Sequence, residues 1–172
     1  YYPHKNLLIT EIVTNFMTAV LKSLNATDFK ELNTYSKMKI FIYLILEQGI
    51  QDEGVERVVK SILSDSDSLD CWSQILDDWL RNEGVKHELG SDRQVQIGLN
   101  FIVTAGGSLY IKRAELDLDA DQISDIMVKT FMSTFLSMDE SKIDQTIDAA
   151  KSALQKYELA TLTQTINEMF DN

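Results

Sequence analysis

The sequence predicts an all-α fold, a single compact bundle of six to eight helices extending over residues 1–172. Three observations lead to this prediction. Apolar residues recur at spacings of three and four along most of the chain, as on the buried face of a helix. Helix-capping residues precede these stretches. The one proline is Pro3, so no helix breaker follows it,. A hydrophobic fraction of 44% with 25% charged residues is typical of a globular protein,.

The N-terminal stretch predicts one helix with a wide apolar face, formed by Leu8, Ile12, Phe16, Val20 and Leu24,. A short helix capped by Thr27 is expected next. Residues 34–49 are ambiguous, because their β-branched and aromatic run also suits a buried strand. Ser36 as a cap and Gly49 as a terminator favour a helix there.

Two further helices are predicted before residue 91. Residues 54–63 place Val55, Val58, Val59 and Ile62 together,. In residues 68–84, Trp72, Leu76 and Trp79 share one face, which predicts a core stripe with Asp77 and Asp78 turned to solvent,. Asp67 or Ser68 is expected to cap this helix.

Residues 94–118 carry two conflicting patterns. Apolar residues stand at alternate positions in the first part, followed by adjacent glycines, which suits a hairpin: Val95, Ile97, Leu99, Phe101 and Val103,. The alternative fold class is therefore α+β with one β-hairpin over residues 94–118. A capping box of Ser91 and Gln94, with Gly106 as a stop, favours a helix instead. Gly98 counts against the helix by about 1 kcal/mol relative to alanine.

The C-terminal third has the clearest periodicity. One long amphipathic helix is expected from Asp119 to Met138 and another over residues 143–157,. Residues 159–169 keep helical spacing in a different phase, which predicts a kink or short connection near Glu158.

The aspartates of residues 117–125 invite comparison with a calcium loop. Counted from Asp117, however, the sixth position is Gln122, where the loop needs glycine, and the twelfth is Val128, where it needs glutamate,. A helix start capped by Asp119, with Asp121 in its first turn, accounts for the acids without an ion. No metal site is predicted.

Other chemistry-bearing residues also have simpler interpretations. His87 has no histidine partner at metal-ligand spacing, and Cys71 has no basic neighbour in sequence to activate it,. The glycines of residues 104–108 lack the lysine of a phosphate loop. We therefore predict no catalytic residue and no cofactor-binding residue.

Charge limits the partners of the protein. The net charge is −11, and residues 114–172 hold 12 acidic and 4 basic side chains. Such a field repels nucleic acid and anionic lipid and attracts basic proteins. The longest apolar run, residues 40–46, is too short to span a bilayer,. The single cysteine, Cys71, favours a reducing compartment, and a cytoplasmic location is expected,.

Three classes of function follow. The leading hypothesis is a non-enzymatic protein–protein interaction domain that acts through a helix face or groove. The second is an acidic inhibitor, immunity or decoy protein that binds a basic partner. The third is a small-ligand sensor domain. The candidate interaction surface consists of acidic residues on two neighbouring helices: Asp121, Asp125, Asp144 and Asp148.

Overall fold

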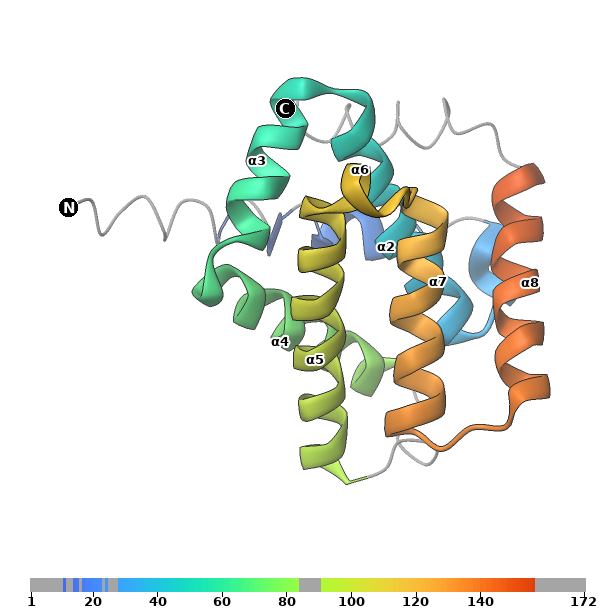
Figure 1. Ribbon diagram of the computed structural model, residues 1–172. Helices are drawn as coiled ribbons and strands as arrows, with labels where there is room; N and C mark the ends of the chain where they lie inside the picture. Colours follow the sequence, from blue (N-terminus) through green and yellow to red (C-terminus); the bar gives the residue numbers. More distant parts are fainter. Residues whose placement is uncertain are drawn as a thin grey trace.

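The structure, a computed structural model, describes residues 28–83 and 91–156 together with residues 11, 14, 15, 17–22 and 24. Every secondary-structure element in these ranges is helical, and the helices pack against one another (Figure 1). The predicted all-α, multi-helix bundle is thus confirmed. The described residues of positions 11–24 are helical, and Val20 and Leu24 of the predicted apolar face are buried, as are Met17 and Leu21.

Helix α2 (Thr34–Gln51) forms the centre of the bundle and packs against α3, α7 and α8. A one-turn 3-10 helix, η1 (Asp28–Glu31), precedes it. The predicted cap, Ser36, is wrong: the side chain of Asn33 accepts from the Ser36 backbone N–H at 2.8 Å and caps the helix. Gly49 does not end α2. A Cβ at Gly49 would lie 2.3 Å from the Tyr110 hydroxyl, so this glycine allows α5 to approach closely.

Helices α3 (Glu53–Leu63) and α4 (Ser66–Asn82) follow after short turns. Asp65 caps α4 in place of the expected Asp67 or Ser68, because its carboxylate accepts from the Ser68 backbone N–H at 2.9 Å. The predicted stripe of Trp72, Leu76 and Trp79 is buried in the core.

Helix α5 (Asp92–Ile111) occupies the region of the alternative hairpin, so that alternative is wrong. Ser91 caps the helix as predicted. Gly106 does not stop it, and both Gly98 and Gly106 serve helix packing. A Cβ at Gly98 would lie 2.7 Å from Cγ of Phe135, and one at Gly106 would lie 2.3 Å from the Met127 sulfur.

A short helix, α6 (Arg113–Leu116), ends at Asp117, whose φ of 52° is left-handed. Helix α7 (Ala120–Thr130) then begins with a capping box of Asp119 and Gln122, which confirms Asp119 as the cap. The helix expected to reach Met138 is confirmed as far as Phe135 and is wrong beyond it. A π-helical turn, η3 (Phe131–Phe135), follows α7, and the chain turns before Glu140.

Helix α8 (Glu140–Lys156) begins just after Asp139, whose carboxylate accepts from the Lys142 backbone N–H at 2.9 Å. In Figure 1, α5, α7 and α8 stand side by side, with α2 behind α7 and α4 crossing behind α5. None of the described helices is both long and apolar enough to cross a membrane.

Several predictions concern positions outside the described residues. These are the Thr27 cap, the interpretation of His87 and the helical stretch of residues 159–169. The extent of one domain over residues 1–172 also includes such positions and stays a prediction.

Candidate functional site: the α4–α5 cleft and its apolar border

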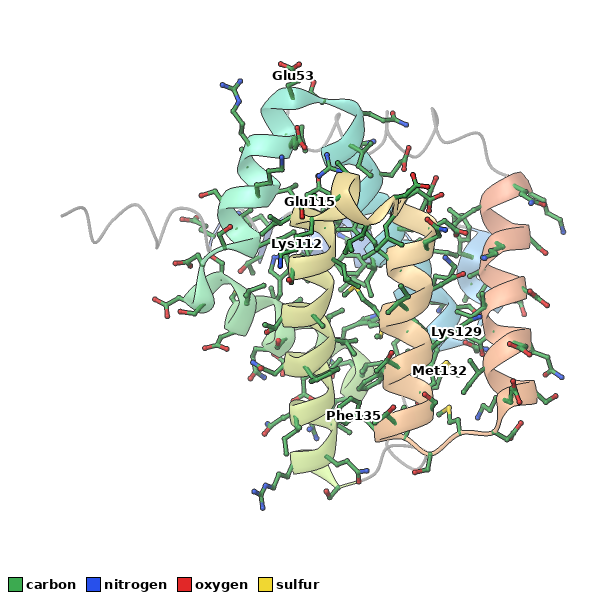
Figure 2. The ribbon with its side chains drawn as sticks, in the orientation of Figure 1. Glu53, Lys112, Glu115, Lys129, Met132 and Phe135 are labelled. Atoms are coloured by element: carbon green, nitrogen blue, oxygen red, sulfur yellow. The ribbon has the colours of Figure 1, made fainter. Side chains whose placement is uncertain are left out.

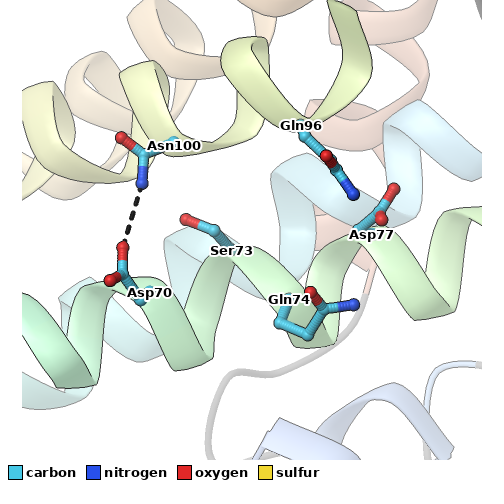
Figure 3. A pocket seen from close by; sticks show the side chains of 6 residues that line it. All are labelled: Asp70, Ser73, Gln74, Asp77, Gln96 and Asn100. Carbon is cyan, nitrogen blue, oxygen red and sulfur yellow. Dashed lines mark hydrogen bonds between the residues drawn. The ribbon is translucent and has the colours of Figure 1, made fainter. Parts of the chain in front are cut away.

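A polar cleft opens between α4 and α5. Its volume is about 260 Å³, and it is lined by four side chains of α4 and two of α5: Asp70, Ser73, Gln74, Asp77, Gln96 and Asn100 (Figure 3). Asp70, Ser73 and Asp77 follow one another at spacings of three and four, with Gln74 next to Ser73, and Gln96 and Asn100 are four apart, so each set lies on one side of its helix,. The cleft is therefore the seam where two polar helix faces meet.

The two helices run antiparallel along this seam. Asn100 donates to Oδ1 of Asp70 at 3.1 Å near the start of α4. At the other end of α4, Arg81 lies 2.7 Å from Oδ1 of Asp92, in the first turn of α5. These two contacts fix the register of the helices and hold the walls of the cleft in place.

Asp77 is the buried carboxylate of the cleft. Only 2% of the residue is exposed, which contradicts the expectation that it faces solvent. Two nitrogens of Arg81, one turn later on α4, each lie 3.0 Å from its Oδ1 atom. The hydrogen bonds that Arg81 donates to Asp77 and Asp92 raise the pKa of Arg81 well above its ordinary value, so the guanidinium stays charged. Asp78, in contrast, is exposed as predicted.

An apolar strip borders the cleft on α5. It consists of Ile97 and Phe101, which follow Gln96 and Asn100 by one position each, and of Phe135 from η3. Ile97 is 52% exposed and Phe101 is 54% exposed. The rings of Phe101 and Phe135 lie 5.6 Å apart at 49°, within the usual range of aromatic pairs,. Figure 2 shows Phe135 between α5 and the end of α7.

Asp121 and Asp125, two residues of the predicted acidic surface, lie in a different environment. They form a Lys–Asp cluster with Lys39 of α2 and Lys151 of α8. Lys39 is completely buried and lies 2.7 Å from Asp121 and 2.8 Å from Asp125. Lys151 lies 3.1 Å from Asp121 and 2.7 Å from Asp125. The two negative charges are thus matched by two positive ones.

Burial and ion pairing shift the pKa values of two residues in this cluster, Asp121 and Lys151. Burial on its own raises the pKa of Asp121, but the hydrogen bonds and charges of Lys39 and Lys151 outweigh it and hold that pKa below 3.8. The hydrogen bond to Asp125 raises the pKa of Lys151 above 10.5, with a further contribution from Asp121. Asp121 and Lys151 are therefore both charged at neutral pH.

Ser124 lies beside the cluster in an arrangement that resembles a catalytic serine–lysine pair. Its Oγ is 2.9 Å from Nζ of Lys39. The Lys39 Nζ atom also contacts the carboxylates of Asp121 and Asp125, so it is not reserved for Ser124. Both Ser124 and Lys39 are also completely buried, so no substrate reaches them. The pair supports the packing of α2 on α7.

Asp144 and Asp148 lie on the exposed side of α8. The structure therefore brings Asp121 and Asp125 together but does not bring the second pair into the same cluster. That all four residues form one interaction surface stays a prediction.

The other residues considered for metal binding have structural roles. Asp119 caps α7, and Asp117 ends α6. Within residues 28–83 and 91–156, the acidic, histidine and cysteine side chains do not form a group of three that could hold a metal ion.

Comparison with known proteins identifies no relative. No family model matches the chain, and no curated protein or solved structure is similar enough to count as a match. Function is therefore argued from the site alone.

Sequence reasoning did not identify the cleft. The signal is present in the spacing of Asp70, Asp77, Gln96 and Asn100, which places polar residues on one face of each helix,. The same spacing occurs on any solvated helix face. The sequence does not show which polar faces meet, because that depends on the docking of α4 against α5.

Proposed function

We propose that the protein is a non-enzymatic interaction domain that binds a protein partner through the exposed face of α5. The observation that supports this most is the exposure of Ile97 and Phe101 on one face, next to Phe135. Aromatic and aliphatic side chains of this kind are frequent anchors at the centre of protein interfaces. Covering them removes apolar surface from water, which favours association.

The polar cleft next to the strip suits the border of such an interface, because interfaces place polar groups around an apolar centre. A volume of about 260 Å³ lies just below the range of about 300–1,000 Å³ typical of pockets for drug-sized ligands,. This favours the interaction domain over a small-ligand sensor. A cytoplasmic location, supported by the single Cys71, is part of this proposal,.

The test is a double variant, Ile97→Ser with Phe101→Ser. Both residues are more than half exposed, so the variant should fold with wild-type stability,. A partner captured with the wild-type chain by cross-linking should bind this variant at least about tenfold more weakly. Val58→Ser, which removes an apolar residue that is 49% exposed on α3, is the matched control. If the double variant and the control bound the partner equally well, the exposed face of α5 would not be the binding surface.

A second candidate is the acidic inhibitor or decoy protein. It is supported by the balance of 12 acidic and 4 basic side chains in residues 114–172 and by the exposure of Asp144 and Asp148. This function requires binding to a basic partner that weakens steeply as salt increases.

A further inference from the structure

The side chains on the walls of the α4–α5 cleft present several hydrogen-bond acceptors,. The amide group of Asn100 donates to Asp70 at 3.1 Å, and that of Gln74 donates to Asp78 at 3.0 Å. The Ser73 hydroxyl donates to the backbone carbonyl of Leu69 at 3.0 Å. The carbonyl oxygens of both amides and the lone pairs of the serine oxygen remain able to accept.

The two carboxylates of the cleft add further acceptors. The two contacts from Arg81 to Asp77 both go to Oδ1, and Asn100 donates to Oδ1 of Asp70. Within the part of the chain that the structure describes, no hydrogen bond uses Oδ2 of either residue. A ligand that supplies several hydrogen-bond donors at once therefore finds acceptors on both walls of this cleft.

Charge points to a cation. Arg81 pairs with Asp77, whereas Asp70 forms no ion pair among the described residues. The cleft thus carries an uncompensated negative charge at neutral pH and repels phosphates and carboxylates.

Shape favours a guanidinium group over a compact ammonium. A guanidinium is planar and carries five N–H donors that point outward in fixed directions. The acceptors of the cleft lie on two facing helices, with Asp70, Ser73 and Asp77 on one wall and Asn100 on the other (Figure 3). A flat group between these walls can donate to both, whereas an ammonium has three donors around one point.

We propose that the α4–α5 cleft binds the guanidinium group of an arginine side chain of the protein partner. This inference rests on the proposed function, because the cleft lies next to the apolar strip on α5. A partner segment whose apolar residues cover Ile97 and Phe101 places a neighbouring arginine over Gln96 and Asn100. The arginine then fixes the position of the partner segment along α5, which apolar contacts alone do not fix.

The first experiment titrates the full ¹⁵N-labelled chain with Nα-acetyl-arginine amide and follows the side-chain amide signals of Gln96 and Asn100 by NMR. The matched probe is Nα-acetyl-citrulline amide, which has nearly the same shape but a neutral urea group. Saturable shifts with the arginine probe, weakened by added salt, are expected. Equal shifts with the citrulline probe would overturn the proposal, because the charge would then be irrelevant.

Asp70→Asn tests the cleft with little risk to folding, because Asp70 is exposed and asparagine still accepts from Asn100. This variant should bind the arginine probe about tenfold more weakly. Asp67→Asn removes an exposed charge of the same helix, one turn away from the cleft, and should bind as the wild type does. Unchanged binding by Asp70→Asn would reject the site.

The experiments distinguish failure of the guanidinium site from failure of the α5 interface. The Ile97→Ser, Phe101→Ser variant should keep wild-type affinity for the arginine probe, because neither residue lines the cleft. If it keeps this affinity but also keeps partner binding, the α5 face is not the interface although the cleft is a guanidinium site. If the arginine probe fails while partner binding still depends on Phe101, the proposed function stands and the inference falls.

Discussion

Lys39 of α2 and Lys151 of α8 contact the same two carboxylates, Asp121 and Asp125 of α7, at distances of 2.7–3.1 Å. All four lysine–aspartate pairs are in contact, so the cluster ties three helices together through alternating charges. Lys39 is completely buried, whereas the Lys151 side chain is 38% exposed. The two lysines should therefore differ in their effect on stability.

We expect Lys39→Met to destabilise the protein by about 3–5 kcal/mol, because it leaves two partly buried carboxylates with one lysine. Methionine keeps the length of the side chain, so loss of packing contributes little. Lys151→Met should cost about 1 kcal/mol or less, since that pair is partly solvated. Urea denaturation measures both changes. If Lys39→Met were as stable as Lys151→Met, the buried lysine would contribute no more to the stability of the fold than the partly exposed one.

The cluster also predicts how stability depends on pH. The pKa of Asp121 is lowered in the folded state, so its contribution is present above pH 3.8 and is lost as the pH falls through the folded-state value,. The pKa of Lys151 is raised, so its contribution is present below pH 10.5 and is lost as the pH rises through the folded-state value,.

We therefore expect the stability difference between the wild type and Asp121→Asn to be largest near neutral pH and to shrink in acid. Denaturation midpoints measured across the acid range provide the test. Asp148→Asn removes an exposed carboxylate of α8 and should show a much smaller difference. A difference between the wild type and Asp121→Asn that does not change with pH would contradict the role of the ion pairs.

The Lys–Asp cluster also shows where sequence reasoning succeeds and where it stops. The Asp119–Gln122 capping box and the Ser91 cap are local, so a few neighbouring residues predict them,. The partners of Asp121 are not local: Lys39 lies 82 residues earlier, and no pattern around the aspartate indicates it. The stripe of Trp72 and Trp79 follows from periodicity, whereas the burial of Asp77 depends on Arg81 and on the docking of α5.

The glycines of α5 also have a role that the sequence alone does not predict. Gly98 argues against a helix when only propensity is considered, and Gly106 suits the end of one, yet both lie inside α5,. They occur there because α7 and η3 pack too closely for a Cβ atom. A sequence shows that a glycine is present but does not show whether it serves a turn or a close helix contact.

Two glycines of α5 give a matched pair of predictions. A Cβ at Gly98 would lie 2.7 Å from Cγ of Phe135 and 3.0 Å from a ring atom of Phe131, both in rigid rings. Gly98→Ala should cost about 1–2 kcal/mol, since overpacking outweighs the gain in helix propensity. A Cβ at Gly107 has its nearest contacts at 3.4 Å, so Gly107→Ala should stabilise by about 0.5–1 kcal/mol,. Thermal unfolding of the two variants checks the opposite signs, and equal effects would contradict the packing argument.

The buried tryptophans of α4 predict a large stability effect away from the cleft. Trp79 is 8% exposed in the core, and Trp79→Ala should cost about 3–5 kcal/mol,. Ile97→Ala, at a site that is 52% exposed, should change stability by less than about 0.5 kcal/mol,. Chemical denaturation distinguishes these outcomes. A small effect of Trp79→Ala would place the residue among candidate binding residues.

The last prediction separates the acidic surface from the α5 face. Asp144 and Asp148 are exposed and four residues apart on α8, so they share a face, and replacing both with lysine should leave the fold intact,. If the protein acts as an acidic decoy, this variant, which changes the net charge by four units, should lose affinity for a basic partner and lose its salt dependence.

If the protein instead binds through Ile97 and Phe101, the Asp144→Lys, Asp148→Lys variant should bind the partner with nearly wild-type affinity. The rate of association should change more than the rate of dissociation, because distant charges act mainly on the encounter. Surface plasmon resonance at two salt concentrations separates the two rates. A tenfold rise in the dissociation rate would place α8 inside the interface and would favour the acidic surface over the α5 face.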